Sequence, residues 1–240
     1  ALIERDRAAS LVRVRVGDER LELKLKLLSE WTPLKFKAAP GVYISGICRM
    51  MVTEMDDHLS LYVTPLNIDP ENPAMPISHP GFFSTYMAKK VGPYATLGLA
   101  EDTWALNEGV IDDGTFLKLA YDIDAERKEM FFASLDKLRT GTLSCVFDAT
   151  DRIQHMFWRY YEKDHPAARG KDPGEFKNAV EDIYLHNDIL VGQVIERLQK
   201  GDLLMVISDH GFTSFRRGCN LNAWLLKNGY LFLKDGAEGT

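Results

Sequence analysis

The chain of 240 residues lacks the features that mark several large classes of protein. Its three cysteines are widely spaced and form no CxxC motif, which excludes a disulfide scaffold and favours a reducing, cytoplasmic location. No apolar run approaches the roughly 18 residues that a membrane-spanning helix needs. The first ten residues, ALIERDRAAS, contain neither an initiator methionine nor the apolar core of a signal peptide. We therefore expect a soluble domain that was processed or cut from a longer chain.

A basic excess is also missing. Lys and Arg total 29 against 35 Asp and Glu, so the formal net charge is −6. A general nucleic-acid binder neutralises phosphates with a surplus of Lys and Arg, so this charge balance argues against a nucleic-acid partner. With 45% hydrophobic and 27% charged residues, the composition is that of an ordinary globular protein.

Apolar and polar residues alternate over residues 11–64. This period of two predicts half-buried strands, and the short polar connections predict antiparallel neighbours. The basic face, with Arg13 and Arg15, could bind polyanions, although a solvated sheet face explains it more simply. We predict an antiparallel β subdomain over residues 1–64, to which 42–47 and 59–64 contribute strands. Its apolar face is predicted to contain Val12, Val14, Val16, Leu21, Leu23, Leu25 and Leu27.

Helical periodicity follows a proline-rich loop at residues 65–81. The apolar segments 142–147 and 203–207 directly follow the two longest predicted helices. Alternation of helix and short buried strand is typical of an α/β layer with parallel strands. Residues 65–240 are therefore predicted to form an α/β part in which these two segments are neighbours in one sheet. Helices are expected over 82–91, 100–108, 113–139 and 174–200.

Two Asp/His pairs follow the two predicted strands, where open parallel sheets place their ligand sites. Asp151 and His155 are spaced i, i+4, so a helix would project both from one face. Asp209 and His210 are adjacent at the end of the second predicted strand, and Gly211 offers a permissive backbone at the turn. Carboxylate and imidazole groups in such pairs can bind a divalent cation such as zinc or manganese.

Either pair alone is more simply explained as an ion pair or a turn cap. Together, at the ends of consecutive strands, the pairs suit a site for two cations. Because two such cations lie about 3.5–4 Å apart, we expect the four side-chain tips within about 10 Å of one another. The sequence lacks HxHxDH and HExxH motifs, which disfavours metallo-β-lactamase and zincin interpretations.

The motifs FDATDRIQHMFWRYY and, some fifty residues later, VISDHGF resemble the alkaline phosphatase superfamily in its type I phosphodiesterase/nucleotide pyrophosphatase branch. The stretches YVTPLNIDPENPAMPIS and FRRGCNLNAWLLKNGYL are similar to the same group, so the resemblance covers most of residues 40–232. It implies an α/β fold with an alkaline-phosphatase-like parallel-sheet core flanked by helices, into which the N-terminal antiparallel sheet is inserted.

The resemblance also implies a metal-dependent hydrolase of small phosphorylated substrates that forms a covalent phospho-enzyme on a Thr or Ser. Asp151 and His155 would bind one metal, and Asp209 and His210 the second. The two divalent cations would be zinc, alternatively manganese. Arg216 could contact the substrate phosphate through its guanidinium group, although a surface arginine is the simpler interpretation.

The chain departs from the family pattern at two places. No counterpart of the family's early Asp and nucleophile occurs in residues 1–10, and no His follows His210. We therefore expect an internal fragment that is inactive alone, with its nucleophile upstream of residue 1. A non-catalytic binding or scaffold domain is the competing interpretation. A phosphomutase or sulfatase of the same superfamily is another, although no Cys lies in the Cys/Ser-x-Pro-x-Arg context of a sulfatase.

Overall fold

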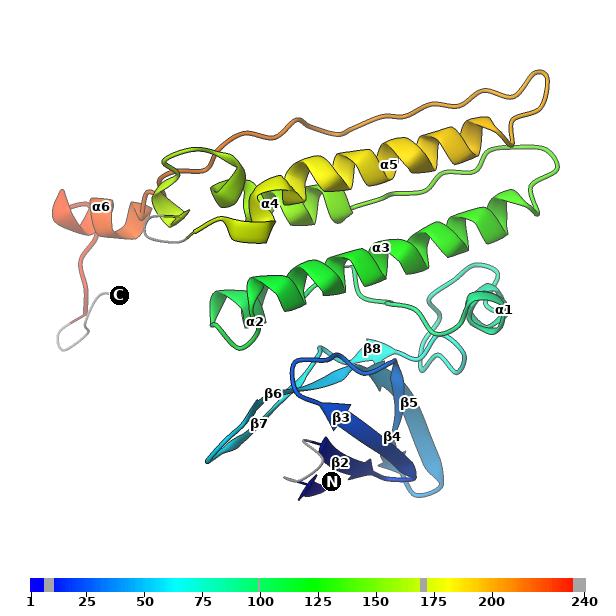
Figure 1. The fold of residues 1–240 in the computed structure, drawn as a ribbon, viewed down its shortest axis with the longest axis horizontal. Helices are drawn as coiled ribbons and strands as arrows, with labels where there is room; N and C mark the ends of the chain where they lie inside the picture. The colour runs from blue at the N-terminus through cyan, green and yellow to red at the C-terminus, as the bar shows by residue number, and fades with distance from the viewer. Residues whose placement is uncertain (7–10, 99, 169–171, 235–240) are drawn as a thin grey trace. The chain divides into compact units, whose positions relative to one another are not determined.

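A computed structural model describes residues 1–6, 11–98, 100–168 and 172–234 of the chain (Figure 1). These fall into two compact units, residues 1–153 and 154–240. The strands are β1 (Leu2–Asp6), β2 (Leu11–Val16), β3 (Glu19–Lys24), β4 (Thr32–Ala39), β5 (Val42–Cys48), β6 (Met50–Met55), β7 (Leu59–Val63) and β8 (Asn67–Ile68). The helices are α1 (Phe83–Val91), α2 (Thr103–Asn107), α3 (Asp113–Leu135), α4 (Ala149–Tyr161), α5 (Ala179–Ile195) and α6 (Leu221–Lys227).

The N-terminal strands are antiparallel, as the alternation predicts, but they form three small sheets rather than one. The orders are β1-β2-β3, β4-β5-β8 and β6-β7. The turn between β2 and β3 contains Gly17, whose φ of 59° is readily adopted only without a side chain. The sheets share one hydrophobic cluster, which contains Val12, Val14, Leu23, Cys48, Met50 and Val52.

The apolar face predicted from the alternation extends further along the sequence than the face that is buried in the structure. Leu23 is 2% exposed, whereas Leu25 and Leu27 are 47% and 50% exposed. The reason is that β3 ends at Lys24 and Lys26 adopts a φ of 55°, so the chain turns out of the ladder before Leu27. Alternation in the sequence therefore continues past the end of the strand.

The long helix α3 is the scaffold of the first unit. Its N-cap is Asp112, whose carboxylate accepts the amide hydrogen bond of Thr115 at 2.9 Å. Phe116 and Leu119 on its inner face are buried. The buried Arg49 joins the strands to this helix, because its guanidinium donates to the Asp122 carboxylate at 2.8 Å and to the carbonyl of Ser29 at 2.7 Å.

Neither of the two predicted parallel strands is present as a strand. Residues 142–147 extend along α3, where Arg127 donates to the carbonyl of Val146 at 3.1 Å and the rings of Phe131 and Phe147 lie 5.6 Å apart. Residues 203–207 are also extended and unpaired (Figure 1). A strand requires a hydrogen-bonded neighbour, and no described residue supplies one to either segment. The fold is therefore mixed α and β, but the expected parallel-sheet core is not shown.

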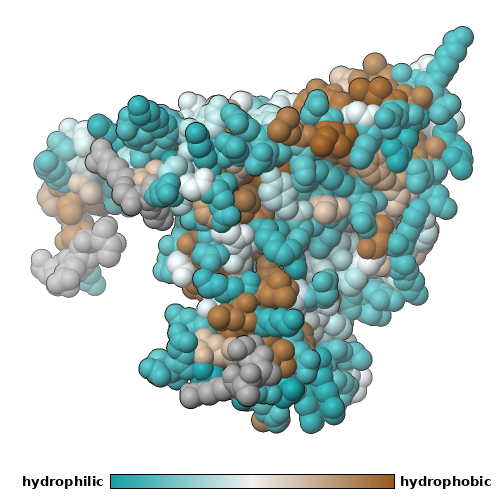
Figure 2. All heavy atoms as spheres, viewed as in Figure 1, coloured by the Kyte–Doolittle hydropathy of each residue, from teal (hydrophilic) through white to brown (hydrophobic). Residues whose placement is uncertain are grey.

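The second unit exposes much of its apolar surface. In α5, Ile183, Leu190 and Val194 are buried, whereas Ile189 is 58% exposed. The extended segment after this helix leaves Ile207 83% exposed. Figure 2 shows hydrophobic side chains gathered over the end of α5 and the chain that follows it.

The helix predicted over 174–200 is present, but it begins as a 3₁₀ turn, Gly174–Asn178, which α5 continues.

No described helix is both long enough and apolar enough to cross a bilayer. The proposed boundary between residues 64 and 65 and the cytoplasmic location stay predictions.

Candidate metal centre

The helix α4 carries Asp151 and His155, as the i, i+4 spacing predicts. Its inner face is apolar, because Ile153 and Phe157 are completely buried, and this burial fixes which face of the helix remains for polar groups. Asp151 lies in the first turn, where a carboxylate interacts favourably with the positive end of the helix dipole. The helix thus places a carboxylate and an imidazole one turn apart.

Charged groups surround the first turn of α4. The guanidinium of Arg152 lies 3.5 Å from the Asp151 carboxylate, and that of Arg127 lies 3.6 Å from the carboxylate of Asp148. Glu101 is only 3% exposed, and its burial raises the pKa of its carboxyl group. Its Oε1 finds no hydrogen-bond partner among the described residues. The start of the helix is therefore held by ionic groups of both signs.

The second predicted pair lies on an exposed turn. The side chains of Asp209 and His210 are 89% and 59% exposed, with 3.7 Å between Asp209 Oδ2 and His210 Nε2. His210 Nδ1 lies 2.8 Å from the carbonyl oxygen of Gly211, and the Ser208 hydroxyl donates to the carbonyl of His210 at 2.6 Å. Gly211 does not adopt a positive φ, so the permissive backbone that this glycine was expected to offer is not used here.

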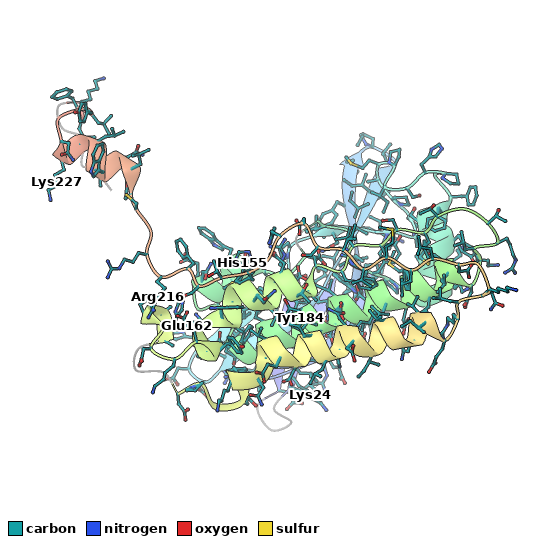
Figure 3. All side chains as sticks on the ribbon, turned by 90° about the horizontal axis from the view of Figure 1, so that it is seen from above. Lys24, His155, Glu162, Tyr184, Arg216 and Lys227 are labelled. Atoms are coloured by element: carbon teal, nitrogen blue, oxygen red, sulfur yellow. The ribbon has the colours of Figure 1, made fainter. Side chains whose placement is uncertain are left out.

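Phe212 brings the second motif into contact with the first. Its ring lies edge-on to the His155 imidazole, with 4.9 Å between centroids and 81° between planes. The same ring lies 5.1 Å from the ring of Trp158, one turn further along α4. The Asp-His-Gly-Phe segment and the Asp-x-x-x-His helix therefore meet at His155, which Figure 3 labels on α4.

Arg216 is held by the end of the same helix. Its guanidinium donates to the carbonyl of Asp164 at 2.8 Å and lies 3.4 Å from the carboxylate of Glu162. Figure 3 labels Arg216 and Glu162 near one another. These contacts occupy part of the guanidinium with protein groups, and the predicted contact of Arg216 with a substrate phosphate stays a prediction.

The donor set fits a divalent cation in chemistry but is not assembled into a closed site. Carboxylates and imidazoles are suitable ligands for zinc and manganese. Among the residues that the structure describes, however, no three His, Cys, Asp or Glu side chains are placed to hold one ion. Asp209 and His210 belong to a segment without sheet pairing, so no ladder fixes their position. The clustering of all four donors within about 10 Å stays a prediction.

Phe212, Trp158 and Glu162, which take part in the contacts between α4 and the later segment, were not predicted from the sequence. A signal was present, because His155, Trp158 and Glu162 are spaced i, i+3, i+7 and so lie along one face of a helix. Their partners in the Asp-His-Gly-Phe segment lie about fifty residues away, and no periodicity links them.

Comparison with known proteins assigns the family. The family model described as type I phosphodiesterase/nucleotide pyrophosphatase matches residues 70–239, a range that contains both Asp/His pairs. No curated protein and no solved structure matches the chain significantly. Members of this family, which is part of the alkaline phosphatase superfamily, hydrolyse phosphodiester or pyrophosphate bonds in small substrates, generally with zinc or manganese. The match covers well over half of the chain, which therefore belongs to the type I phosphodiesterase/nucleotide pyrophosphatase family.

Proposed function

We propose that this chain is the metal-binding part of a two-metal phosphoric ester hydrolase of the phosphodiesterase/nucleotide pyrophosphatase type. The observation that carries the proposal is the contact of the two motif segments, in which the Phe212 ring lies 4.9 Å from the His155 imidazole. Local spacing alone would not bring residues 57 positions apart together. The family match, which spans both segments, supports the same assignment.

In this proposal Asp151 and His155 hold one cation, and Asp209 and His210 hold the second. Zinc or manganese would neutralise negative charge that develops on the phosphoryl oxygens of a small phosphodiester or nucleotide. Two protein ligands for each cation are fewer than the three that catalytic zinc sites ordinarily use. The remaining ligands and the Thr or Ser nucleophile are therefore proposed to lie outside these 240 residues.

The extended apolar segments 142–147 and 203–207 are also part of the proposal. Leu203 and Ile207 are 82% and 83% exposed, and Val146 is 70% exposed. Continuous apolar runs of this length are typical of strands buried on both faces of a parallel sheet. We propose that 142–147 and 203–207 become strands once a further strand, which carries the nucleophile, lies beside them. Pairing would then fix the position of Asp209 and His210 at a strand end.

A non-catalytic binding or scaffold domain is the second candidate. The observation that favours it is the lack of any three-donor group among the described residues. A phosphomutase or sulfatase of the same superfamily is the alternative within enzymes.

Hydrolysis of bis(p-nitrophenyl) phosphate separates these candidates. The 240-residue chain and the protein encoded by the complete reading frame would be assayed with zinc and with manganese. We expect activity from the complete protein and none from the chain alone, because loss of a covalent nucleophile costs several orders of magnitude in rate. Asp209→Ala should abolish the activity, and Asp188→Ala, an exposed carboxylate of α5, should leave it unchanged. An inactive complete protein would support the scaffold, and an active 240-residue chain would place the nucleophile within it.

A further inference from the structure

The segment from Asp209 to Arg216 contacts α4 at two separate places. At the first, Phe212 lies against the rings of His155 and Trp158. At the second, Arg216 binds the Glu162 carboxylate and a backbone carbonyl just beyond the helix. Between the two contacts, residues 213–215 form neither a helix nor a strand.

The segment is long enough to reach both contact points on α4. Glu162 lies seven positions after His155 and directly follows the last residue of α4, which corresponds to a rise of about 10.5 Å at 1.5 Å per residue. Arg216 lies four positions after Phe212, and a stretch of this length reaches at most about 13–14 Å when extended. The segment therefore runs alongside α4 in the same direction as the helix and can make both contacts.

Each contact has a distinct physical basis. The edge-on geometry between Phe212 and the imidazole directs a positive ring edge at a negative ring face, an arrangement that aromatic pairs prefer. The Phe212 ring also lies against Trp158, whose ring centroid is 5.2 Å from that of Tyr161. Arg216 donates to the carbonyl of Asp164, three residues beyond the end of α4, and its charge is paired with the Glu162 carboxylate at 3.4 Å.

We propose that Phe212 and Arg216 are positioning residues, which together clamp the Asp209-His210 turn to the His155 end of α4. Phe212 restricts the rotation of the His155 imidazole, and Arg216 prevents the segment from lifting off the helix. The role of the clamp in metal binding rests on the proposed function. The clamp itself does not, because its contacts form between protein side chains alone.

The chain offers matched controls for both residues. Phe215 lies three residues after Phe212 and is 76% exposed, so its replacement removes a phenyl ring without removing the contact. Arg217 lies next to Arg216 and is exposed, so Arg217→Ala removes the same charge from the same segment. Phe212→Tyr retains the aromatic ring, so it should keep the contact with His155 that Phe212→Ala removes.

The test first measures the ring resonances of His155 and then the affinity of the protein for zinc. In metal-free protein labelled with ¹³C-histidine, Phe212→Ala should move the ring resonances of His155, whereas Phe215→Ala should not and Phe212→Tyr should leave them near their original positions. Zinc titration of the same proteins by calorimetry should then show affinity about ten- to hundredfold lower for Phe212→Ala, the range for groups that orient a metal ligand. Arg216→Ala should weaken zinc binding in the same direction, and Arg217→Ala should not.

Failure of the clamp, failure of its role in metal binding and failure of the proposed function give different results. Resonances of His155 that do not respond to Phe212→Ala would overturn the clamp, whatever zinc does. Resonances that respond, with equal zinc affinity in the original and Phe212→Ala proteins, would overturn the positioning role. If the protein encoded by the complete reading frame, which would carry the remaining ligands, binds no zinc, the proposed function fails, and the resonances alone decide whether the clamp exists. Far-ultraviolet circular dichroism checks that every variant remains folded.

Discussion

The indole of Trp31 donates a hydrogen bond of 2.6 Å to the carboxylate of Glu126, a residue 95 positions later in the chain. The other carboxylate oxygen of Glu126 accepts the backbone amide of Ala95 at 2.8 Å. Burial raises the pKa of the Glu126 carboxyl group, whereas both hydrogen bonds favour the ionised form. One side chain of α3 thus fastens two loops of the first unit.

Removal of this contact is expected to destabilise the first unit. Trp31→Phe keeps the aromatic ring but leaves the half-buried carboxylate without one donor, at a cost of about 1–3 kcal/mol in the free energy of unfolding. Urea denaturation followed by circular dichroism measures the change. Trp104→Phe is the matched control, because Trp104 is 74% exposed and should change stability very little. Equal effects of the two substitutions would contradict the role of the hydrogen bond.

The buried Glu101 predicts a dependence of stability on pH. Burial is the largest influence on its carboxyl group and raises the pKa, as does Asp148, whereas Arg152 and Arg127 lower it. A raised pKa means that the native state binds the proton more tightly than the unfolded chain does. This contribution to stability is fully present below the unfolded value of about 4.3 and is lost as the pH rises through the native value.

Glu101→Gln removes the charge that burial disfavours. The variant is therefore expected to gain stability relative to the original protein as the pH rises from 4 to 8. Urea denaturation at several pH values gives the difference directly. A difference that stays constant over this range would show that Glu101 is ionised equally easily in the folded and unfolded chain, and a change of opposite sign would show that folding favours its ionisation; either result contradicts the prediction.

The end of β3 predicts unequal effects for two leucines of the same apolar pattern. Leu23→Ala should cost about 2–5 kcal/mol, because Leu23 is 2% exposed within the shared hydrophobic cluster. Leu25→Ala should cost much less, since Leu25 is 47% exposed. Thermal unfolding of both variants measures the difference. Similar losses would place Leu25 in the core, as the alternation alone predicts.

Ile207→Ser tests the proposed completion of the parallel sheet. In the 240-residue chain its effect on stability should stay within about 0.5 kcal/mol, the usual range for a surface position, because Ile207 is 83% exposed. In the protein encoded by the complete reading frame, the same change should cost about 2–5 kcal/mol, because the side chain would be buried between layers. A small effect in both proteins would argue against a buried strand at 203–207.

Local signals in the sequence predicted local structure well. The alternation around Val12 and Val14 gave a strand with the correct buried face, because a two-residue period depends only on neighbouring side chains. The apolar stripe of 113–139 gave α3, with Phe116 and Leu119 buried, because a 3.6-residue period is equally local. The spacing of Asp151 and His155 likewise placed both residues on one helix.

Features that depend on distant partners could not be predicted in this way. The segment 203–207 has the composition of a buried strand, but a strand also needs a neighbour, which the pattern of one segment does not provide. The contact of Phe212 with His155 joins residues 57 positions apart, and nothing in either local sequence specifies it. For the same reason, the sequence indicated the type of donors in the candidate site but not their arrangement.

Asp151, His155, Asp209 and His210 are proposed to hold two cations in the complete protein. Anomalous X-ray scattering at the zinc edge, from crystals of that protein grown with zinc, locates the ions directly. We expect two peaks about 3.5–4 Å apart, one about 2.0–2.1 Å from a ring nitrogen of His155 and the other at the same distance from a ring nitrogen of His210. Zinc bound at other residues, with both imidazoles free of metal, would contradict it.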